Sequence, residues 1–532
     1  MQRCDLLVRG GAVVDGTGAT RRRADVAVQG DRIASVGALD EWVGEVTLEA
    51  AGLVVAPGFI DMHSHSDLAL LIEGRAESKL RQGVTTEVIG QCGFSPAPAP
   101  RDRSAEWQGI PGWMAGHVDW SWESFGQYLA ALGRAGTSVN VVPVVGHNMV
   151  RAAVMGQHDR PPTSEELTAM RRAVQAAMAE GAFGLSTGLV YAPGMFAQAD
   201  EILALCQAME GRGIYFTHIR SEGEGLLEAI SEAAQIGREA GVPVQIAHLK
   251  ASPRRYWGRT EQALGLIEGL RERGEADVCY DAYPYTAWNT ALAQLLPAWA
   301  REGGGEALAA RLGDAATRAR LRASLAEEAE ADPGRWEQRI VGSVEGPENR
   351  DLQGLTLAAA AERRGQAPED LVLDLLLEER GEVGMIGYGM CEEDVRRVIA
   401  HPLGLIGSDA AAAAPYGVLG GTFPHPRTYG TFPRVLGRYV REERALSLEE
   451  AVAKMTGRAA ARLGLEDRGR IAEGMAADLV VFDPERIADR ADYAQPHVYP
   501  AGIRYVVVNG VLELDGEEHR NRRPGRVLTR PL

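Results

Sequence analysis

The chain has 532 residues, of which 45% are hydrophobic and 24% charged, so it is long enough for more than one domain and has the composition of a globular protein. Its 56 basic and 73 acidic residues give a formal net charge of −17, which disfavours nucleic acid or an anionic membrane as the main partner. No apolar stretch reaches the roughly 18 residues of a membrane span. The five scattered cysteines predict a reducing, cytoplasmic environment rather than a disulfide framework.

Both ends of the chain predict strands of one small β domain. Residues 1–56 alternate apolar and polar positions between Gly-rich turns, which is typical of antiparallel strands and not of a signal peptide. The same texture returns near the other end in ADLVVFDP and IRYVVVNGVLEL. We therefore expect residues 1–56 and 466–532 to form a small β-sandwich domain beside the main domain.

Between these segments, apolar strands alternate with helical stretches. Eight candidate strands occupy 53–62, 84–91, 139–146, 182–188, 213–219, 243–249, 276–283 and 403–408. Strands that are apolar throughout and alternate with helices predict an α/β fold, and eight such units predict a (β/α)8 TIM-like barrel over residues 57–465. The mostly helical stretch at about 290–400 predicts an insertion before the eighth strand.

Histidine, cysteine and aspartate stand at the carboxyl ends of five of these strands. They are His63 and His65 after the first strand, Cys92 after the second, His218 and His248 after the fifth and sixth, and Asp409 after the eighth. A barrel carries its chemistry at this edge, and these residue types bind divalent metals. A thiolate ligand favours zinc over magnesium or manganese. The pattern predicts a zinc site that activates water, with Asp67 placed to orient an imidazole.

Two of these residues have other interpretations. Cys92 is also interpretable as a core residue, or as a nucleophile activated by a neighbouring histidine. Asp409 is expected to take a proton from the attacking water and pass it to the leaving group, although an aspartate after a strand can also cap a helix.

Taken together, these segments resemble the amidohydrolase superfamily and, within it, the D-aminoacylase (N-acyl-D-amino-acid deacylase) family. The resemblance covers nearly the whole chain, and its most specific segments are PGFIDMHSHSD, GQCGFSPAP, GLSTGLVYAPG, THIRSEG, QIAHLK, DAYPY, GSDA and PHPRTYGTFPRVLG. It implies zinc-dependent hydrolysis of N-acyl-D-amino acids to a carboxylate and a free D-amino acid. A related amidohydrolase acting on L-Xaa-D-Xaa dipeptides or cyclic amides, and a non-catalytic amidohydrolase-like binding protein, stay open as alternatives.

The resemblance also implies how the metal is held. One tight zinc ion would be bound by Cys92, His218 and His248, whereas His63 and His65 would contact a second, weaker metal position or line the first. Many binuclear relatives bridge two metals through a carbamylated lysine on the fourth strand. This chain has no lysine between Lys79 and Lys250, and Cys92 resembles the ligand that replaces that bridge. The number of metal ions and the oligomeric state are left open.

The resemblance implies a binding site for the carboxylate of a small anionic substrate. Its expected residues are Lys250, Tyr283 and Arg427, with Tyr191 and Asn289 as further candidates. An acidic protein that binds an anion needs a localised cation, and a guanidinium offers a bidentate fork. The alternatives are a surface salt bridge for Arg427, loop bracing for Lys250 and packing for Tyr191. Because the sequence places no second cation for an acidic side chain, it favours neutral or hydrophobic D-amino acids.

Overall fold

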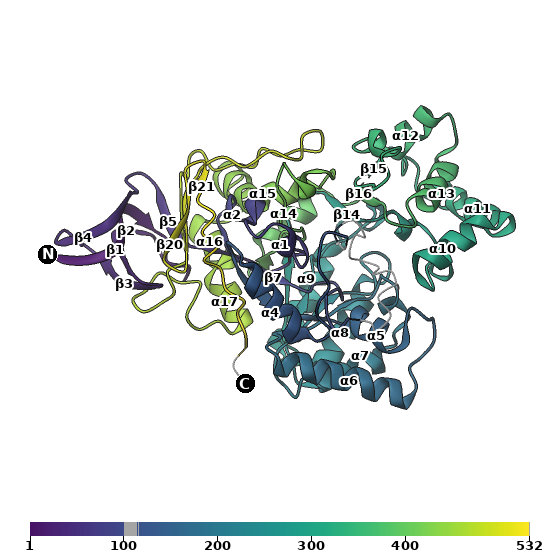
Figure 1. Cartoon of the computed structure of the whole chain (residues 1–532), viewed down its shortest axis with the longest axis horizontal. Helices are drawn as coiled ribbons and strands as arrows, with labels where there is room; N and C mark the ends of the chain where they lie inside the picture. Colours follow the sequence, from purple (N-terminus) through teal and green to yellow (C-terminus); the bar gives the residue numbers. More distant parts are fainter. Residues whose placement is uncertain (100–113, 115, 531–532) are drawn as a thin grey trace.

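The computed structural model describes residues 1–99, 114 and 116–530. A sheet built from both end regions of the chain, a central body of parallel strands and helices, and a mostly helical insertion follow one another along the longest axis of the molecule (Figure 1). Within the described part of the chain, no helix has the length and apolar character that crossing a bilayer requires.

The two ends of the chain meet in one mixed sheet of nine strands. Its order is β21-β20-β19-β18-β5-β1-β2-β3, with β4 paired to β1. The strands are β1 (Gln2–Val13), β2 (Arg22–Gln29), β3 (Arg32–Gly37), β4 (Trp42–Glu49), β5 (Val54–Pro57), β18 (Leu479–Phe482), β19 (Ile503–Val508), β20 (Val511–Asp515) and β21 (Glu518–His519). Alternate residues of both halves, such as Leu6, Val26, Leu479 and Val507, pack in a shared core.

The predicted strand at 53–62 is divided between this sheet and the parallel strands. Val54–Pro57 pairs with β1 and β18, whereas Phe59–Asp61 forms β6 and pairs with β7. Gly58 lies at the junction, where a Cβ atom would be 2.1 Å from Oγ1 of Thr85. Glycine therefore lets the chain pass close to β7 as it leaves one sheet for the other.

All strands of the central body run parallel. They are β6 (Phe59–Asp61), β7 (Val84–Ile89), β8 (Asn140–Pro143), β9 (Val145–Gly146), β10 (Gly184–Gly188), β11 (Ile214–His218), β12 (Val244–Ile246), β13 (Val278–Ala282) and β17 (Gly404–Ile406). β8 leads into β9 after one residue, and the Met62 N–H donates to the Ile406 carbonyl at 3.2 Å, which links β17 to β6. This arrangement is consistent with the predicted TIM-like barrel.

Amphipathic helices accompany these strands. They are α1 (Ala69–Ile72), α2 (Glu77–Leu80), α4 (Phe125–Ala135), α5 (His147–Met155), α6 (Ser164–Ala179), α7 (Ala199–Gln207), α8 (Leu226–Ala240), α9 (Arg259–Glu272), α14 (Glu392–Ala400), α15 (Arg427–Arg434), α16 (Leu448–Met455) and α17 (Gly457–Leu463). α8 is representative, because Leu226, Ile230, Ala233 and Ala234 repeat every three or four residues and form its buried face.

The insertion between β13 and β17 has a hydrophobic core of its own, which includes Leu308, Leu321, Leu371 and Leu376. Its helices are α10 (Gly304–Gly313), α11 (Ala315–Ala331), α12 (Leu357–Arg364) and α13 (Pro368–Glu378). It also contains an antiparallel sheet of β14 (Ala287–Ala291), β16 (Gly384–Tyr388) and β15 (Arg339–Val341), which the sequence did not predict. Strands of three to five residues are too short to show a reliable period of two.

Candidate metal centre and substrate cavity

The six residues at the strand ends come together in space. Their ligand atoms form two groups, within each of which the atoms lie less than 4.8 Å apart. One group contains His63, His65, Cys92 and Asp409, and the other contains Cys92, His218 and His248. Cys92 belongs to both groups, so the donors lie where one ion, or two adjacent ions, would share a thiolate.

The distances around Cys92 fit zinc. Its Sγ atom lies 3.6 Å from Nε2 of His248 and 3.7 Å from Nδ1 of His218. A sulfur and a nitrogen bound to the same tetrahedral zinc, at usual bond lengths, are about 3.5 Å apart. On the other side, Sγ lies 3.3 Å from Nε2 of His63. Burial raises the pKa of the Cys92 thiol, but the imidazoles of His63, His218 and His248 outweigh burial and hold this pKa well below its usual value.

The backbone at three of these positions is left-handed. The φ angles of Cys92, His248 and Asp409 are 54°, 34° and 51°. Residues other than glycine seldom adopt such angles, and those that do are concentrated at functional sites. A Cβ atom on the neighbouring Gly93 would lie 2.3 Å from Oδ1 of Asn148, so a side chain there would displace the loop that carries the thiol.

One carboxylate that the sequence did not reveal contacts two imidazoles at their outer nitrogens, which are the nitrogens that do not face Cys92. Oε1 of Glu222 lies 3.1 Å from Nδ1 of His248 and 3.6 Å from Nε2 of His218. It also accepts a hydrogen bond of 2.5 Å from Nζ of Lys250. Burial raises the pKa of Glu222, but Lys250 and the two histidines outweigh burial and lower it. The available signal was its position four residues after His218 in THIRSEG.

A second carboxylate, Asp281 on β13, holds the first-strand histidine. Its Oδ1 lies 3.2 Å from Nδ1 of His63 and accepts the backbone N–H of His248 at 2.8 Å. The sequence analysis gave an orienting role to Asp67. Asp281 makes the contact with His63, whereas Oδ1 of Asp67 has no hydrogen-bond partner among the described residues, and the orienting role of Asp67 stays a prediction.

Asp409 lies between the histidines and a buried arginine. Its Oδ1 is 3.1 Å from Nε2 of His65 and 3.4 Å from Nε2 of His63, while Oδ2 is 2.8 Å from Nη1 of Arg427. Burial raises the pKa of Asp409, but Arg427 and the histidines outweigh burial and hold this pKa well below its usual value. The side chain is therefore a carboxylate that touches both the donor cluster and a cation.

The residues expected to bind a carboxylate also lie together. The Arg427 side chain, at the start of α15, is 3% exposed, and its Cζ lies 4.6 Å from the ring centroid of Tyr283. Nζ of Lys250 lies 5.7 Å from the same centroid, but this amine is also bonded to Glu222 and lies 2.8 Å from Nδ1 of His248. Tyr283 thus separates two cations.

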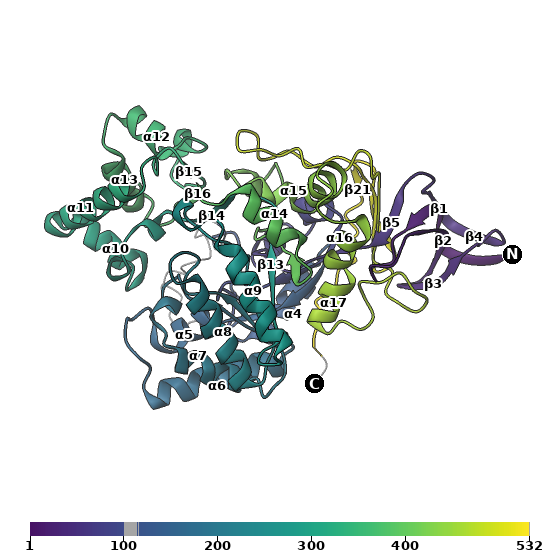
Figure 2. The same ribbon diagram turned by 180° about the vertical axis from the view of Figure 1, so that it is seen from behind.

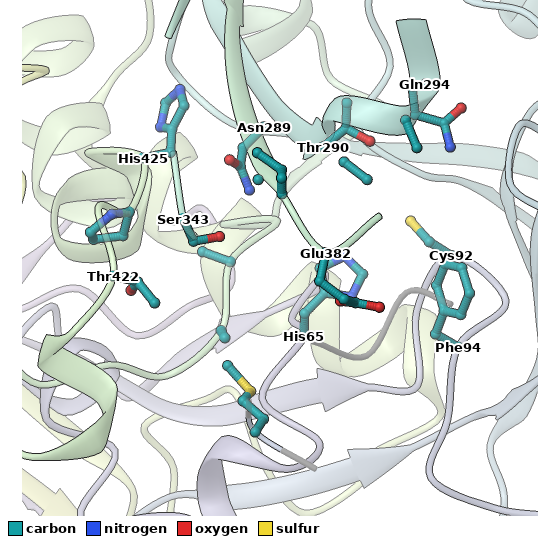
Figure 3. Close-up of a pocket in the computed structure, with 18 of the residues that line it drawn as sticks. His65, Cys92, Phe94, Asn289, Thr290, Gln294, Ser343, Glu382, Thr422 and His425 are labelled. Atoms are coloured by element: carbon teal, nitrogen blue, oxygen red, sulfur yellow. The ribbon is translucent and has the colours of Figure 1, made fainter. Parts of the chain in front are cut away.

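A cavity of about 340 Å³ opens beside the donor cluster and is walled by the insertion. Figure 3 shows Asn289 and Glu382 of the insertion around the same cavity as His65 and Cys92. Tyr191 also lines it, with its hydroxyl 3.1 Å from Oγ1 of Thr290 and its ring 5.1 Å from that of His218.

Two further arginines, Arg301 and Arg380, line the cavity. The Arg301 guanidinium donates to the Val190 carbonyl at 2.9 Å and has no ion pair within the described ranges. The sequence placed no second cation for an acidic side chain, whereas the cavity is lined by these two arginines. Acidic D-amino acids stay candidates alongside neutral ones.

Sequence comparison identifies the family of the chain. Residues 46–512 match the amidohydrolase family model. The chain is 40% identical to a D-aminoacylase of Alcaligenes xylosoxydans xylosoxydans over 99% of this chain and 98% of that protein. It is 36% identical to an N-acyl-D-aspartate deacylase and to an N-acyl-D-glutamate deacylase of the same organism, over 98% and 99% of this chain and 95% and 97% of those proteins.

Structural comparison gives the same answer. A D-aminoacylase crystal structure superposes with a TM-score of 0.84 at 37% identity, over 99% of this chain and 100% of that one. The N-acyl-D-glutamate deacylase of Bordetella bronchiseptica, complexed with zinc and a phosphonate inhibitor, superposes with a TM-score of 0.83 at 35% identity and the same coverage. D-aminoacylase has a binuclear metal centre. The resemblance read from the sequence is confirmed: the chain belongs to the D-aminoacylase family of amidohydrolases and is a metal-dependent hydrolase.

Proposed function

We propose that this enzyme hydrolyses the amide bond of N-acyl-D-amino acids and that one zinc ion, on Cys92, His218 and His248, is sufficient for the reaction. The observation that carries this proposal is the position of Asp409, which contacts the histidines through one oxygen and Arg427 through the other. This arrangement matches a substrate in which the scissile amide is close to a carboxylate. The amide would lie at the metal ligands and Asp409, and the carboxylate would lie at Arg427.

Bound zinc would act as a Lewis acid that polarises the scissile carbonyl and lowers the pKa of water. Asp409 accepts the proton of the attacking water and returns it to the leaving nitrogen. Arg427 pairs with the α-carboxylate through its bidentate fork, next to Tyr283 and Lys250. Fixing both the carboxylate and the acyl carbonyl leaves one enantiomer with its side chain in the free part of the cavity.

His63 and His65 are proposed to line this site and to provide a second, weaker metal position through Cys92. Tyr191 and Asn289 are proposed to shape the space for the acyl group and the side chain, because both line the cavity beside the cluster. Zinc is favoured over harder metals by the thiolate that the two groups of ligand atoms share.

A substrate panel tests the activity. Zinc-loaded enzyme should hydrolyse the N-acetyl derivatives of D-leucine, D-methionine, D-aspartate or D-glutamate and leave their L-enantiomers essentially intact. Hydantoins and L-Xaa-D-Xaa dipeptides belong in the same panel. Hydrolysis of these compounds alone, or of both enantiomers equally, would contradict the proposal.

The variant Asp409→Asn tests the base. It keeps the shape of the side chain but cannot take up the proton, so kcat/KM should fall by about 100- to 10,000-fold. Zinc quantified in the same sample should stay at the wild-type level. Asp515→Asn in β20 of the terminal sheet is the control and should keep full activity. Near-normal turnover by Asp409→Asn would refute the assignment.

A further inference from the structure

A long segment leaves the terminal sheet and runs along the central body. Residues 483–502, here called the strap, connect β18 to β19. Both ribbon views show this yellow loop extending from the mixed sheet over α15 (Figures 1 and 2). Apart from a single β-bridge between Ala488 and Ala501, the strap forms no strand. The path of the strap is therefore set by its contacts with the central body and not by pairing in the terminal sheet.

Several polar contacts of the strap fall on one short stretch of the central body, residues 422–434, and further contacts join Asp489 to Tyr285 and the carbonyls of Pro484 and Ile487 to Arg441. The hydroxyl of Tyr493 lies 3.3 Å from Nε2 of His425. His497 donates from Nε2 to the Thr422 carbonyl at 2.7 Å, and its Nδ1 lies 3.0 Å from the hydroxyl of Tyr429. Asp489 accepts from Nη1 of Arg434 at 2.8 Å. This stretch includes Arg427.

His425 links the strap to the main chain of Arg427. The backbone N–H of Arg427 donates to Nδ1 of His425 at 3.0 Å. A backbone N–H can only donate, so Nδ1 must carry a lone pair and the proton of a neutral ring must be on Nε2. Nε2 then donates to the Ala287 carbonyl, 3.0 Å away at the start of β14, and the hydroxyl oxygen of Tyr493 shares this proton as a second acceptor at 3.3 Å. The ring is 2% exposed and packs edge-on against Tyr285 and Tyr493, with centroids 5.3 and 5.2 Å away.

His425 therefore joins three parts of the protein at one buried point. It contacts the insertion through Ala287, the strap through Tyr493 and helix α15 through the peptide of Arg427. The guanidinium beyond this peptide ends a long side chain, and its Nε has no hydrogen-bond partner in the described part of the chain. Its Nη1 pairs with Asp409, so the direction of the guanidinium depends both on that ion pair and on where the main chain of Arg427 is fixed.

We infer that the strap, acting through Tyr493 and His425, positions Arg427 for the substrate's α-carboxylate, so that the terminal sheet takes part in substrate recognition. The inference rests on the proposed function for the identity of the anion. Tyr493 and His425 are positioning residues, because they act through Arg427. Loosening them should weaken binding of the carboxylate more than it slows the chemistry at the metal centre, where Arg427 also pairs with Asp409.

Three variants separate this role from general stability. Tyr493→Phe removes one hydroxyl and keeps the ring, and His425→Asn keeps an acceptor near Nδ1 but loses the reach to Ala287 and Tyr493. Tyr499→Phe is the matched control. It removes a hydroxyl from the same strap. The ring of Tyr499 packs on Tyr429 with centroids 5.7 Å apart, and within the described residues it makes no hydrogen bond or ring contact with His425. Zinc content and circular dichroism establish that each variant is folded and loaded.

The first readout is the kinetics of the best N-acyl-D-amino acid and its primary carboxamide. For the acid, KM should rise by about 3- to 10-fold in Tyr493→Phe and by more in His425→Asn, with kcat within about 3-fold, as the loss of one or two buried hydrogen bonds predicts. KM for the carboxamide and both constants of Tyr499→Phe should not change. Equal losses for acid and carboxamide, or an unchanged KM for the acid, would overturn the inference.

The second readout does not need turnover. Calorimetric titration of the zinc-loaded proteins with N-methanesulfonyl-D-alanine and its primary amide measures carboxylate recognition, because a sulfonamide resists hydrolysis. The wild type should bind the acid more tightly than the amide, and His425→Asn should lose most of that difference. A wild type that hydrolyses nothing yet shows this difference would refute the proposed function and keep the strap inference. A wild type that shows no difference would refute the inference itself.

Discussion

Glu222 lies where it can orient two of the proposed metal ligands. It contacts the outer nitrogens of His218 and His248, and it also holds the amine of Lys250. A carboxylate on the outer nitrogen of a ligating imidazole fixes its tautomer and ring orientation and makes it a better ligand. Glu222 therefore contacts two proposed metal ligands and also holds Lys250, which is proposed to bind the substrate.

Replacing this carboxylate should therefore weaken metal binding before it affects folding. Glu222→Gln is expected to lower zinc affinity by about 10- to 100-fold, the usual effect of removing a partner of a ligating histidine. Competition against a chromogenic chelator measures the affinity directly. Glu224→Gln, two residues away and exposed, is the control and should bind zinc as the wild type does. Wild-type affinity in Glu222→Gln would show that its contacts with the imidazoles are incidental.

The ligands and their partners differ in how far the sequence reveals them. His63, Cys92 and Asp409 each follow an apolar strand, and in a parallel fold that position alone predicts where the side chain lies. Glu222, by contrast, lies four residues beyond the end of β11, and only the folded loop brings it close to His248. Nothing in the segment PHPR distinguishes His425, because its burial and its hydrogen bond with the backbone N–H of Arg427 arise only in the folded structure.

At the scale of elements, one lysine holds three parallel strands and a helix together. Lys79 on α2 is fully buried, and its Nζ donates to Oδ2 of Asp61 on β6 at 2.7 Å and to Oγ of Ser408 after β17 at 2.7 Å. It also lies 3.6 Å from Oε2 of Glu87 on β7. The backbone N–H groups of His63 and Ser408 donate to Asp61, so this cluster is bonded to the main chain at His63 and next to Asp409.

The variant Lys79→Met should be strongly destabilised, because it leaves Asp61 and Glu87 buried without their cation. Breaking a buried pair by removing one partner costs about 3–5 kcal/mol. The measurement is the free energy of unfolding from urea titration, monitored by circular dichroism. Arg160→Met breaks a surface pair with Glu166 and should cost less than about 1 kcal/mol. Similar losses in the two variants would contradict a special role for the buried cluster.

At the scale of the whole molecule, the sequence predicts the parallel strands more easily than it predicts the pairing in the terminal sheet and in the small sheet of the insertion. Long apolar strands separated by helices predict their own pairing, since consecutive units lie side by side. The strand predicted at 53–62 divides between two sheets because the chain changes partner at Gly58, and hydropathy does not record a change of partner. The small sheet in the insertion was missed for a similar reason, since its strands are paired across more than 40 residues.

The insertion has a separate hydrophobic core but supplies one wall of the substrate cavity. Stability therefore need not be uniform: the insertion can open locally while the metal centre stays folded. Leu376, fully buried in α13, belongs to the insertion core, whereas Ile230, fully buried in α8, belongs to the core of the parallel strands. Truncating either to alanine removes a similar apolar volume and costs about 2–5 kcal/mol.

The two truncations should have different consequences, although their costs are similar. In Leu376→Ala, amide hydrogen exchange should accelerate across residues 292–383 and not in α6 or α8, and KM should rise because residues such as Asn289 and Ser343 lose their support. Zinc content should not change. Ile230→Ala should instead accelerate exchange in α8 and the adjacent strands. If Leu376→Ala raised exchange in α8 as much as in α13, the insertion and the parallel strands would unfold as one cooperative unit, and the cavity wall could not move independently of the metal centre.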